Sequence, residues 1–206
     1  MAKLYFRYGT MDSSKTANAL MVRYNYLEKG QNPIILKPKI ENRDGEKTIR
    51  SRIGISAECE FVEDLLEKAE NEWFTGRSDD YKKIDCLIVD EAQFLSAHQV
   101  DVFARIVDEL NVPVVCYGLR TDFTGHLFEG SQRLFELANR LEEVPTVCWC
   151  GKKAVFNARV KDGKMVRTGE QIMMGGNESY ITVCRKHFFQ GQLYPPVPSD
   201  DSGRQS

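Results

Sequence analysis

The chain has 206 residues, the size of one globular domain or of a domain with a small annex. Its 28 Lys and Arg residues against 30 Asp and Glu residues give a net charge of −2. This balance argues against nucleic acid as the main partner, because binding along a phosphate backbone needs a concentrated excess of positive charge. The hydrophobic fraction of 42% is enough to bury a core and excludes general disorder. No segment reaches the roughly 20 apolar residues of a membrane span, and we expect no signal peptide, no membrane partner and a cytoplasmic location.

Strand-like and helix-like segments alternate over the first 145 residues. Short apolar runs predict four buried strands, at residues 4–6, 33–36, 86–89 and 112–117. Helical periodicity predicts four helices, at residues 14–29, 61–72, 99–110 and 131–141. The first helix is expected to bury a face made of Ala17, Leu20, Met21, Tyr24 and Leu27. Strands that alternate with helices predict an α/β fold with a parallel sheet flanked by helices.

Three parts of the chain differ in character. The segment 41–54 is polar and basic without a clear period, which predicts a loop. After residue 145 come short β-like runs and half of the six cysteines, and we expect a lobe at 146–193 that is too small to form its own core. The tail, 194–206, has three prolines followed by polar residues and is expected to be disordered.

The segment Gly9–Thr16, GTMDSSKT, follows the first strand and opens the first helix. It matches the P-loop pattern G-x-x-x-x-G-K-[ST], except that Ser14 stands at the second glycine. Backbone N–H groups and the helix N-terminus would bind phosphates, Lys15 would add a positive charge, and the Thr16 hydroxyl would bind Mg²⁺. An ordinary strand-to-helix turn with Lys15 in solvent is the alternative, and the motif alone leaves both open.

Asp90 and Glu91 directly follow the apolar run 86–89, at the end of a strand where open α/β sheets place ligands. Asp90 would hold Mg²⁺, and Glu91 would act as a general base. An acid pair at the start of a helix is the alternative, and the nearby P-loop favours the catalytic interpretation. Arg43 could neutralise charge during phosphoryl transfer, although an arginine exposed to solvent explains it equally well.

Three cysteines and a histidine form a two-part cluster. One residue separates Cys148 from Cys150, two separate Cys184 from His187, and 33 residues lie between the two pairs. Such a set can bind zinc tetrahedrally, and a complete set of four protein ligands indicates a structural rather than a catalytic site. The first pair is closer than the usual C-x₂₋₄-C spacing, and buried thiols with an exposed histidine are the alternative.

Six segments resemble the type II thymidine kinases, in the same order and at similar spacing: GTMDSSKT, VDEAQFL, YGLRTDF, CWCGKKA, GEQIMMGGNESY and VCRKH. The resemblance covers residues 3 to about 190 and is close to bacterial members. It implies a P-loop-type ATP-binding domain at 1–145 and a zinc-stapled lobe at 146–193 that carries a lasso, the segment beginning at Gln171 that encloses the thymine ring. Three residues depart from the family pattern and bear on nucleotide affinity: Ser14, the added acid Asp12, and Glu41 in place of Asp.

The implied activity is transfer of the ATP γ-phosphate to the 5′-hydroxyl of thymidine or deoxyuridine, with Glu91 as the catalytic base. The resemblance assigns ATP and Mg²⁺ binding to Gly9, Thr10, Met11, Asp12, Ser13, Ser14, Lys15, Thr16, Arg43, Asp90, Glu91, Ala92 and Gln93. It assigns nucleoside binding to Met11, Leu119, Phe123, Phe128, Gln171, Ile172, Met173, Met174, Gly175 and Tyr180. It assigns a structural Zn²⁺ to Cys148, Cys150, Cys184 and His187. It further implies a homotetramer and feedback inhibition by dTTP.

Two other functions remain open at this point. One is a different P-loop phosphotransferase or an ATPase, in which Glu91 would activate water instead of a sugar hydroxyl. The other is a zinc-stapled nucleic-acid-binding module, against which the acidic charge balance argues.

Overall fold

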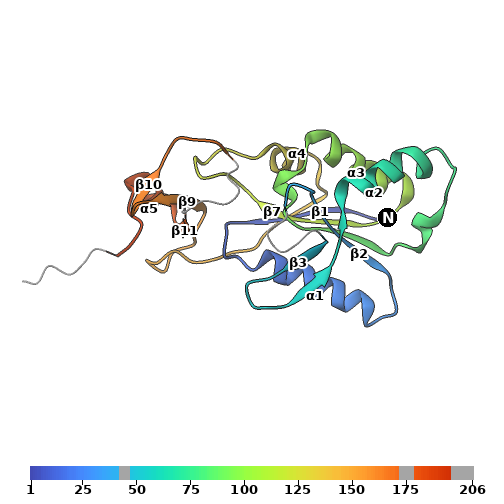
Figure 1. Ribbon diagram of the computed structural model, residues 1–206, viewed down its shortest axis with the longest axis horizontal. Coiled ribbons are helices and arrows are strands. Elements are labelled where there is room, and N and C mark those ends of the chain that lie inside the picture. Colours follow the sequence, from blue (N-terminus) through green and yellow to red (C-terminus); the bar gives the residue numbers. More distant parts are fainter. Residues whose placement is uncertain (42–46, 172–178, 196–206) are drawn as a thin grey trace, which may run out of the picture.

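The computed structural model describes residues 1–41, 47–171 and 179–195 (Figure 1). The expectations for Arg43, for residues 172–175 of the lasso and for the tail beyond residue 195 lie outside the described residues. Within the described residues, no helix combines the length and the apolar character that crossing a membrane requires.

The centre of the molecule is a six-stranded parallel sheet, in the order β5-β2-β6-β7-β1-β8. Its strands in chain order are β1 (Leu4–Gly9), β2 (Pro33–Lys37), β5 (Glu60–Phe61), β6 (Cys86–Val89), β7 (Val114–Leu119) and β8 (Arg140–Glu143). The four predicted strands are β1, β2, β6 and β7, and all four are confirmed. Because β6, β7 and β1 are adjacent, their carboxyl ends meet at one edge of the sheet.

Different helices cover the two faces of this sheet (Figure 1). Leu87 and Val89 of β6 belong to the larger hydrophobic cluster, with the helices α2, α3 and α4. Their neighbours Cys86 and Ile88 belong to a second cluster, with α1. This division follows from the alternation of side chains along a strand, and it explains why the strands are continuous apolar runs. The helices are α1 (Lys15–Leu27), α2 (Val62–Lys68) with its π-helical continuation (Ala69–Trp73), α3 (Ala97–Leu110) and α4 (Glu129–Leu137).

The predicted apolar face of α1 is only partly correct. Ala17, Leu20 and also Ala19 are buried, whereas Met21, Tyr24 and Leu27 are 57%, 60% and 43% exposed. The helix packs against the sheet through Ala19 and Leu20, together with the partly buried Val22 and Tyr26. Met21, Tyr24 and Leu27 therefore lie on a different side of the helix, away from the core.

Two other expectations are corrected by the structure. The predicted helix at 131–141 ends at Leu137, and the chain then enters β8, which pairs with β1 at the edge of the sheet. The predicted loop at 41–54 contains β3 (Thr48–Arg50), which forms an antiparallel hairpin with β4 (Ser56–Glu58). The unpredicted strands β8 and β3 are stabilised by pairing with the backbone of another strand, β1 and β4 respectively. The periodicity of a strand's own residues does not predict such pairing.

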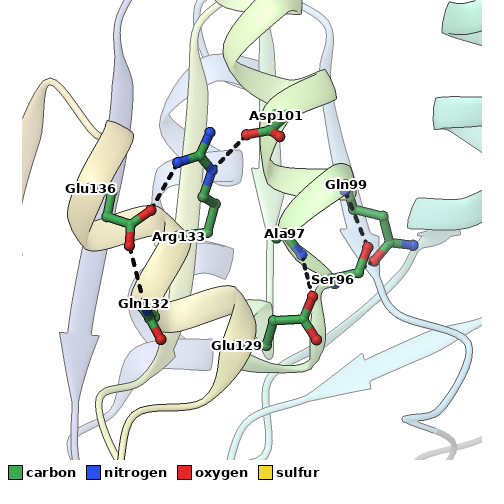
Figure 2. Close-up of polar contacts among 8 residues, drawn as sticks. All are labelled: Ser96, Ala97, Gln99, Asp101, Glu129, Gln132, Arg133 and Glu136. Carbon is green, nitrogen blue, oxygen red and sulfur yellow. Dashed lines mark hydrogen bonds and ion pairs between the residues drawn. The ribbon is translucent and has the colours of Figure 1, made fainter.

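The helices α3 and α4 are joined by polar contacts at their ends (Figure 2). Ser96 and Gln99 form a capping box at the start of α3, and Glu129 at the start of α4 accepts a hydrogen bond from the backbone N–H of Ala97 at 2.8 Å. Further along, Arg133 of α4 donates to Asp101 of α3 at 2.7 Å. These contacts fix α4 against α3 and against the short 3₁₀ turn η3 (Ala92–Phe94) that precedes α3.

A separate lobe follows residue 145. It contains the antiparallel strands β9 (Phe156–Lys161), β10 (Lys164–Val166) and β11 (Ser179–Val183), followed by α5 (Arg185–Gln190). The expectation of a lobe without a core is wrong, because its buried side chains form a hydrophobic cluster of their own: Cys148, Ala154, Ala158, Val160, Val183, Cys184, Phe188 and Leu193. Outside the lobe, a second 3₁₀ turn, η2 (Asp80–Lys83), precedes β6 in the main domain. Figure 1 shows the lobe at the end of the molecule that is remote from the N-terminus.

Candidate active site and metal centre

An open cavity of about 750 Å³ lies at the carboxyl edge of the sheet. Its walls come from four places: the P-loop and start of α1, the end of β2, the β3–β4 hairpin, and the residues that follow β6 and end β7. Of the predicted site residues, the structure brings together Met11, Asp12, Ser13, Ser14, Lys15, Thr16, Asp90, Glu91 and Leu119 in the wall of this cavity. Gly9 and Thr10 form the preceding stretch at the end of β1, and Ala92 and Gln93 are buried in η3 next to Glu91.

The P-loop has the backbone shape that an anion site requires. Asp12 and Ser14 both have left-handed backbone conformations, with φ of 60° and 59°. A chain that alternates in this way can turn successive N–H groups toward one point. The start of α1 at Ser14 has no side-chain cap and no acid in its first turn, so its N–H groups face no competing carboxylate from that turn. The glycine of the P-loop pattern thus corresponds to a left-handed position that serine occupies here.

Lys15 points into the P-loop instead of into solvent. Its Nζ donates to the carbonyl oxygen of Thr10 at 2.6 Å and to the Ser13 hydroxyl at 3.2 Å. Burial lowers the pKa of Lys15, and the carboxylates of Glu91 and Asp90 oppose this shift. The lysine charge therefore lies near the acid pair, in the wall of the same cavity.

Asp90 is the buried member of the acid pair, at 4% exposure. Its backbone N–H donates to the carbonyl of Leu36 at 2.9 Å, and its carboxylate is hydrogen-bonded to the hydroxyl of Thr16. Burial raises the pKa of Asp90, the negative charge of Glu91 raises it further, and the Thr16 hydroxyl opposes both effects. A carboxylate and a hydroxyl oxygen side by side are ligands of the kind that Mg²⁺ prefers.

Glu91 occupies a strained position between β6 and η3. Its φ of 51° and ψ of 37° are left-handed, which is uncommon for a residue other than glycine and is found most often where function requires it. Its carboxylate accepts a hydrogen bond of 2.5 Å from the side-chain amide of Gln93. A carboxylate held in this way at the cavity wall is suited to accept a proton from a bound hydroxyl group.

Three basic residues at the cavity, Lys37, Arg50 and Arg52, were missed from the sequence. Arg52, in the turn of the β3–β4 hairpin, forms an ion pair with Asp12, so the acid that the P-loop carries is paired with a cation. Lys37, at the end of β2, is 1% exposed, and its Nζ donates to the carbonyl of Thr48 at 2.9 Å. A lysine directly after a buried apolar run was the available signal for Lys37, whereas Arg52 had none because the hairpin was not predicted.

Several predicted nucleoside-binding residues meet around Arg159 of β9. The Arg159 guanidinium lies 3.6 Å from the ring centre of Phe123, and its Nε donates to the Tyr180 hydroxyl at 2.9 Å. It also donates to the carbonyl of Gln171 at 3.3 Å, while the Gln171 side-chain amide donates to Asp122 at 2.9 Å. The structure therefore brings Phe123, Gln171 and Tyr180 together, and Arg159, which is 1% exposed, is the residue that sequence reasoning missed.

Two other predicted nucleoside-binding residues, Phe128 and Met11, belong to the main domain. Phe128 is buried at the start of α4 and meets Phe94 edge-on, with ring centres 5.9 Å apart. Met11 is tied to the lobe by its backbone, because its N–H donates to the side-chain carbonyl of Asn157 in β9 at 2.7 Å. Asn157 also donates to the carbonyl of Thr121 at 3.4 Å. One buried lobe residue thus connects the P-loop to the segment after β7.

The predicted metal ligands converge on one point. The potential ligand atoms of Cys148, Cys150, Cys184 and His187 all lie within 4.8 Å of one another. The His187 Nδ1 is 3.4 Å from the Cys148 Sγ and 3.5 Å from the Cys184 Sγ, and the sulfurs of Cys150 and Cys184 are 3.9 Å apart. With Zn–S bonds of about 2.3 Å and a Zn–N bond of about 2.0 Å, a tetrahedral zinc site requires separations of about 3.5 and 3.8 Å. The donor set and its spacing therefore fit a zinc ion.

The surroundings of the cluster hold these ligands in place. The Cys148–Gly151 turn closes with a 2.8 Å hydrogen bond from the Gly151 N–H to the Cys148 carbonyl. The Trp149 ring stacks on the His187 ring, with centres 4.1 Å apart. Burial acts to raise the pKa of Cys184, but backbone N–H groups, first that of His187, and the neighbouring thiols hold it below its usual value. A thiol of this kind is readily deprotonated for metal binding.

Comparison with known proteins decides the family. A family model described as thymidine kinase matches residues 2–188. A thymidine kinase of Lactococcus lactis subsp. lactis (strain IL1403) is 46% identical over 194 residues, which is 94% of this chain and 100% of that protein. A thymidine kinase of Haemophilus influenzae (strain Rd) is 45% identical over 91% of this chain and 96% of its own length. This chain belongs to the thymidine kinase family.

Solved structures give a more distant comparison for this thymidine kinase family member. The crystal structure of a DNA replication initiation factor matches with a TM-score of 0.41 and 19% sequence identity, covering 69% of the chain. AMPPCP-bound DnaA from Aquifex aeolicus matches with a TM-score of 0.40 and the same identity. The chain spans 40% of the length of each of these proteins.

Replacing Ser14 by glycine is expected to stabilise the protein by about 0.5–1 kcal/mol, because glycine adopts the left-handed conformation without strain. ATP binding should stay unchanged or become tighter. Chemical denaturation and titration calorimetry measure the two effects. Ser96→Gly is the matched control, since Ser96 has extended backbone and caps α3, so this substitution should destabilise. Markedly weaker ATP binding by Ser14→Gly would contradict the interpretation of Ser14 as a purely conformational departure.

Replacing Asp90 by asparagine should stabilise the ligand-free protein at pH 8. A carboxyl with a raised pKa binds more protons in the folded than in the unfolded state, so its contribution to stability falls as pH rises above about 4, the pKa of an unfolded aspartate. Asp90→Asn removes this penalty. Its unfolding free energy at pH 8 should exceed that of the wild type by more than about 1 kcal/mol, with a smaller difference at pH 5. Asp108→Asn on the exposed surface of α3 is the control, and an equal response of both variants would refute the prediction.

Proposed function

We propose that this chain is an ATP-dependent thymidine kinase. It transfers the γ-phosphate of ATP to the 5′-hydroxyl of thymidine, and of deoxyuridine, and the dTMP formed from thymidine enters pyrimidine deoxynucleoside salvage. The main support is the 46% identity to a thymidine kinase over the full length of that protein. The cavity adds support, because the P-loop and the acid pair both line it, with the Thr16 hydroxyl hydrogen-bonded to the Asp90 carboxylate.

The P-loop binds the phosphates of ATP in this proposal. The N–H groups of residues 12–16 and the Lys15 ammonium face the phosphate oxygens. Lys15 leaves its present acceptor, the carbonyl of Thr10, to do so. The hydroxyl of Thr16 and the carboxylate of Asp90 hold Mg²⁺, which neutralises phosphate charge when it is bound. Arg43 completes the cationic surroundings of the reacting phosphate.

Glu91 is the catalytic base. Its carboxylate takes the proton of the 5′-hydroxyl as the oxygen bonds to the γ-phosphorus, and the bond from that phosphorus to the β,γ-bridging oxygen breaks to release ADP. The nucleoside lies between the cavity and the cluster around Arg159, with Phe123, Phe128, Gln171 and Tyr180 enclosing it. Ile172, Met173, Met174 and Gly175 complete the lasso around the base.

The zinc ion has a structural role in this proposal. The thiolates of Cys148, Cys150 and Cys184 and the His187 ring would supply four ligands, which would leave no position for a substrate. The lobe that zinc holds together carries Asn157 and Arg159, so its folding supports both the P-loop and the nucleoside-binding residues. A homotetramer, feedback inhibition by dTTP and a cytoplasmic location complete the proposal.

A nucleoside panel tests the function and the catalytic base together. With ATP and Mg²⁺ the wild type should convert thymidine and deoxyuridine to their 5′-monophosphates. Glu91→Gln should fold normally, bind ATP as the wild type does and lose about 10²–10⁴-fold in kcat, as expected when a general base is removed. Glu136→Gln, on the exposed surface of α4, is the matched control. If the wild type hydrolyses ATP equally fast with and without nucleoside, the result would instead support an ATPase. Near-normal turnover by Glu91→Gln would exclude Glu91 as the base.

Elemental analysis of the purified protein should give about one zinc per chain. Cys150→Ser should lower this content and the thermal stability, because an incomplete ligand set binds zinc more weakly and the metal contributes to folding of the lobe. Cys59→Ser is the control, since Cys59 lies in the main domain near β5 and should leave the zinc content unchanged. A metal-free wild type with reduced cysteines and full activity would contradict the four-ligand site.

A further inference from the structure

The side chain of Gln93 bridges two parts of the candidate active site. Its Nε2 donates to the Glu91 carboxylate at 2.5 Å, and its Oε1 accepts a hydrogen bond from the backbone N–H of Leu119 at 2.9 Å. Gln93 is 2% exposed, and its bond to Leu119 is buried, whereas its bond to Glu91 lies at the cavity wall. A single buried amide therefore connects Glu91, the second residue after β6, to the last residue of β7.

The direction of this amide is determined by its partners. The backbone N–H of Leu119 can only donate, so the atom that faces it must be the amide oxygen. The amide nitrogen must then face Glu91, where it can only donate. Gln93 thus presents a hydrogen-bond donor to the carboxylate in one fixed orientation.

Two close backbone contacts keep Gln93 in place. A Cβ atom added at Gly118 would lie 2.9 Å from the backbone nitrogen of Gln93 and 3.1 Å from its Oε1. On the opposite side, a Cβ atom added at Gly130 of α4 would lie 2.7 Å from the Ala92 carbonyl and 2.6 Å from the Leu95 carbonyl. The turn that follows Glu91 is thus packed between β7 and α4 with no room for a side chain at either glycine.

The backbone of Glu91 adds a reason for such support. A left-handed conformation in a residue with a Cβ atom costs of order 1 kcal/mol and persists only where the surroundings enforce it. Such a backbone leaves the direction of a three-carbon side chain open, and the 2.5 Å bond from Gln93 restricts it. Efficient proton transfer needs a base that already has the correct geometry.

We propose that Gln93 is a positioning residue, which holds the Glu91 carboxylate in the orientation that removes the nucleoside hydroxyl proton. This role rests on the proposed function, and it differs from the ATP or Mg²⁺ contact expected for Gln93, since the buried amide uses its polar atoms on Glu91 and Leu119. Gln93 itself does not touch the reacting atoms. Its effect belongs to turnover and not to binding of either substrate.

Two substitutions at Gln93 test this role. Gln93→Met keeps the approximate volume and removes both hydrogen bonds, and Gln93→Glu keeps an acceptor for Leu119 but replaces the donor to Glu91 by a second carboxylate. Both should lower kcat roughly 10- to 100-fold, with the dissociation constants of ATP and thymidine within about twofold of the wild type. Gln132→Glu is the matched control, because Gln132 also donates to a glutamate, Glu136, but on the exposed surface of α4 (Figure 2). It should leave kcat unchanged.

A double-mutant cycle separates positioning from a general structural role. If Gln93 acts through Glu91, then Gln93→Met should have almost no further effect on kcat in the Glu91→Gln background. Independent losses that multiply, a loss confined to substrate binding, or a kcat within about threefold of the wild type in the single variants would each overturn the proposal. Circular dichroism checks folding: if one variant fails to fold the other decides, and failure of both would assign Gln93 to stability alone.

An inactive wild type can be told apart from these results. If the wild type phosphorylates no nucleoside, the proposed function and the role of Gln93 both fail. If the wild type is active and the folded Gln93 variants are equally active, the role of Gln93 fails and the proposed function stands.

Discussion

The candidate active site depends on how closely the turn after β6 is packed. Gly118 of β7 and Gly130 of α4 touch this turn from opposite sides, each at a distance that excludes even a methyl group. Glu91 is thereby held in a left-handed conformation, and Gln93 reaches both its carboxylate and the end of β7. Glu129, the neighbour of Gly130 in α4, accepts a hydrogen bond from the backbone N–H of Ala97 in α3 (Figure 2). Dense packing is useful in an active site because a close-packed interior allows its side chains little movement.

Charge around the cavity is balanced locally, which a net charge of −2 for the whole chain does not reveal. Lys15 and Lys37 are directed inward and hydrogen-bonded to backbone carbonyls, and Arg52 pairs with Asp12. The buried Asp90 has a raised pKa because it lies out of water beside a second acid. Burying charged groups in this way costs desolvation free energy, which a bound cation and a bound anion would offset.

The metal-binding lobe is more than an annex. It has its own hydrophobic cluster, and two of its buried residues reach the rest of the site: Asn157 contacts the P-loop backbone, and Arg159 contacts Phe123, Tyr180 and the segment ending at Gln171. Both residues lie on β9, the central strand of the lobe. A metal ion at the Cys–His cluster would tie the segment around Cys148 and Cys150 to the end of β11 and the start of α5, next to the strand that carries Asn157 and Arg159.

What the sequence by itself determined is local. Properties of a few neighbouring residues predicted four strands, because β1, β2, β6 and β7 are apolar runs. The spacing of GTMDSSKT and the acids after β6 predicted residues that line one cavity. The two-part Cys–His cluster predicted four side chains that converge on one point. The tertiary structure decided what depends on contacts between distant segments. β8 exists because its backbone pairs with β1. Met21 and Tyr24 are exposed because α1 meets the sheet through a different face, which includes Leu20 and Tyr26. Arg52 reaches Asp12 only because the β3–β4 hairpin forms. The role of Gln93 belongs to this second group, since its amide is oriented by an N–H group 26 residues away.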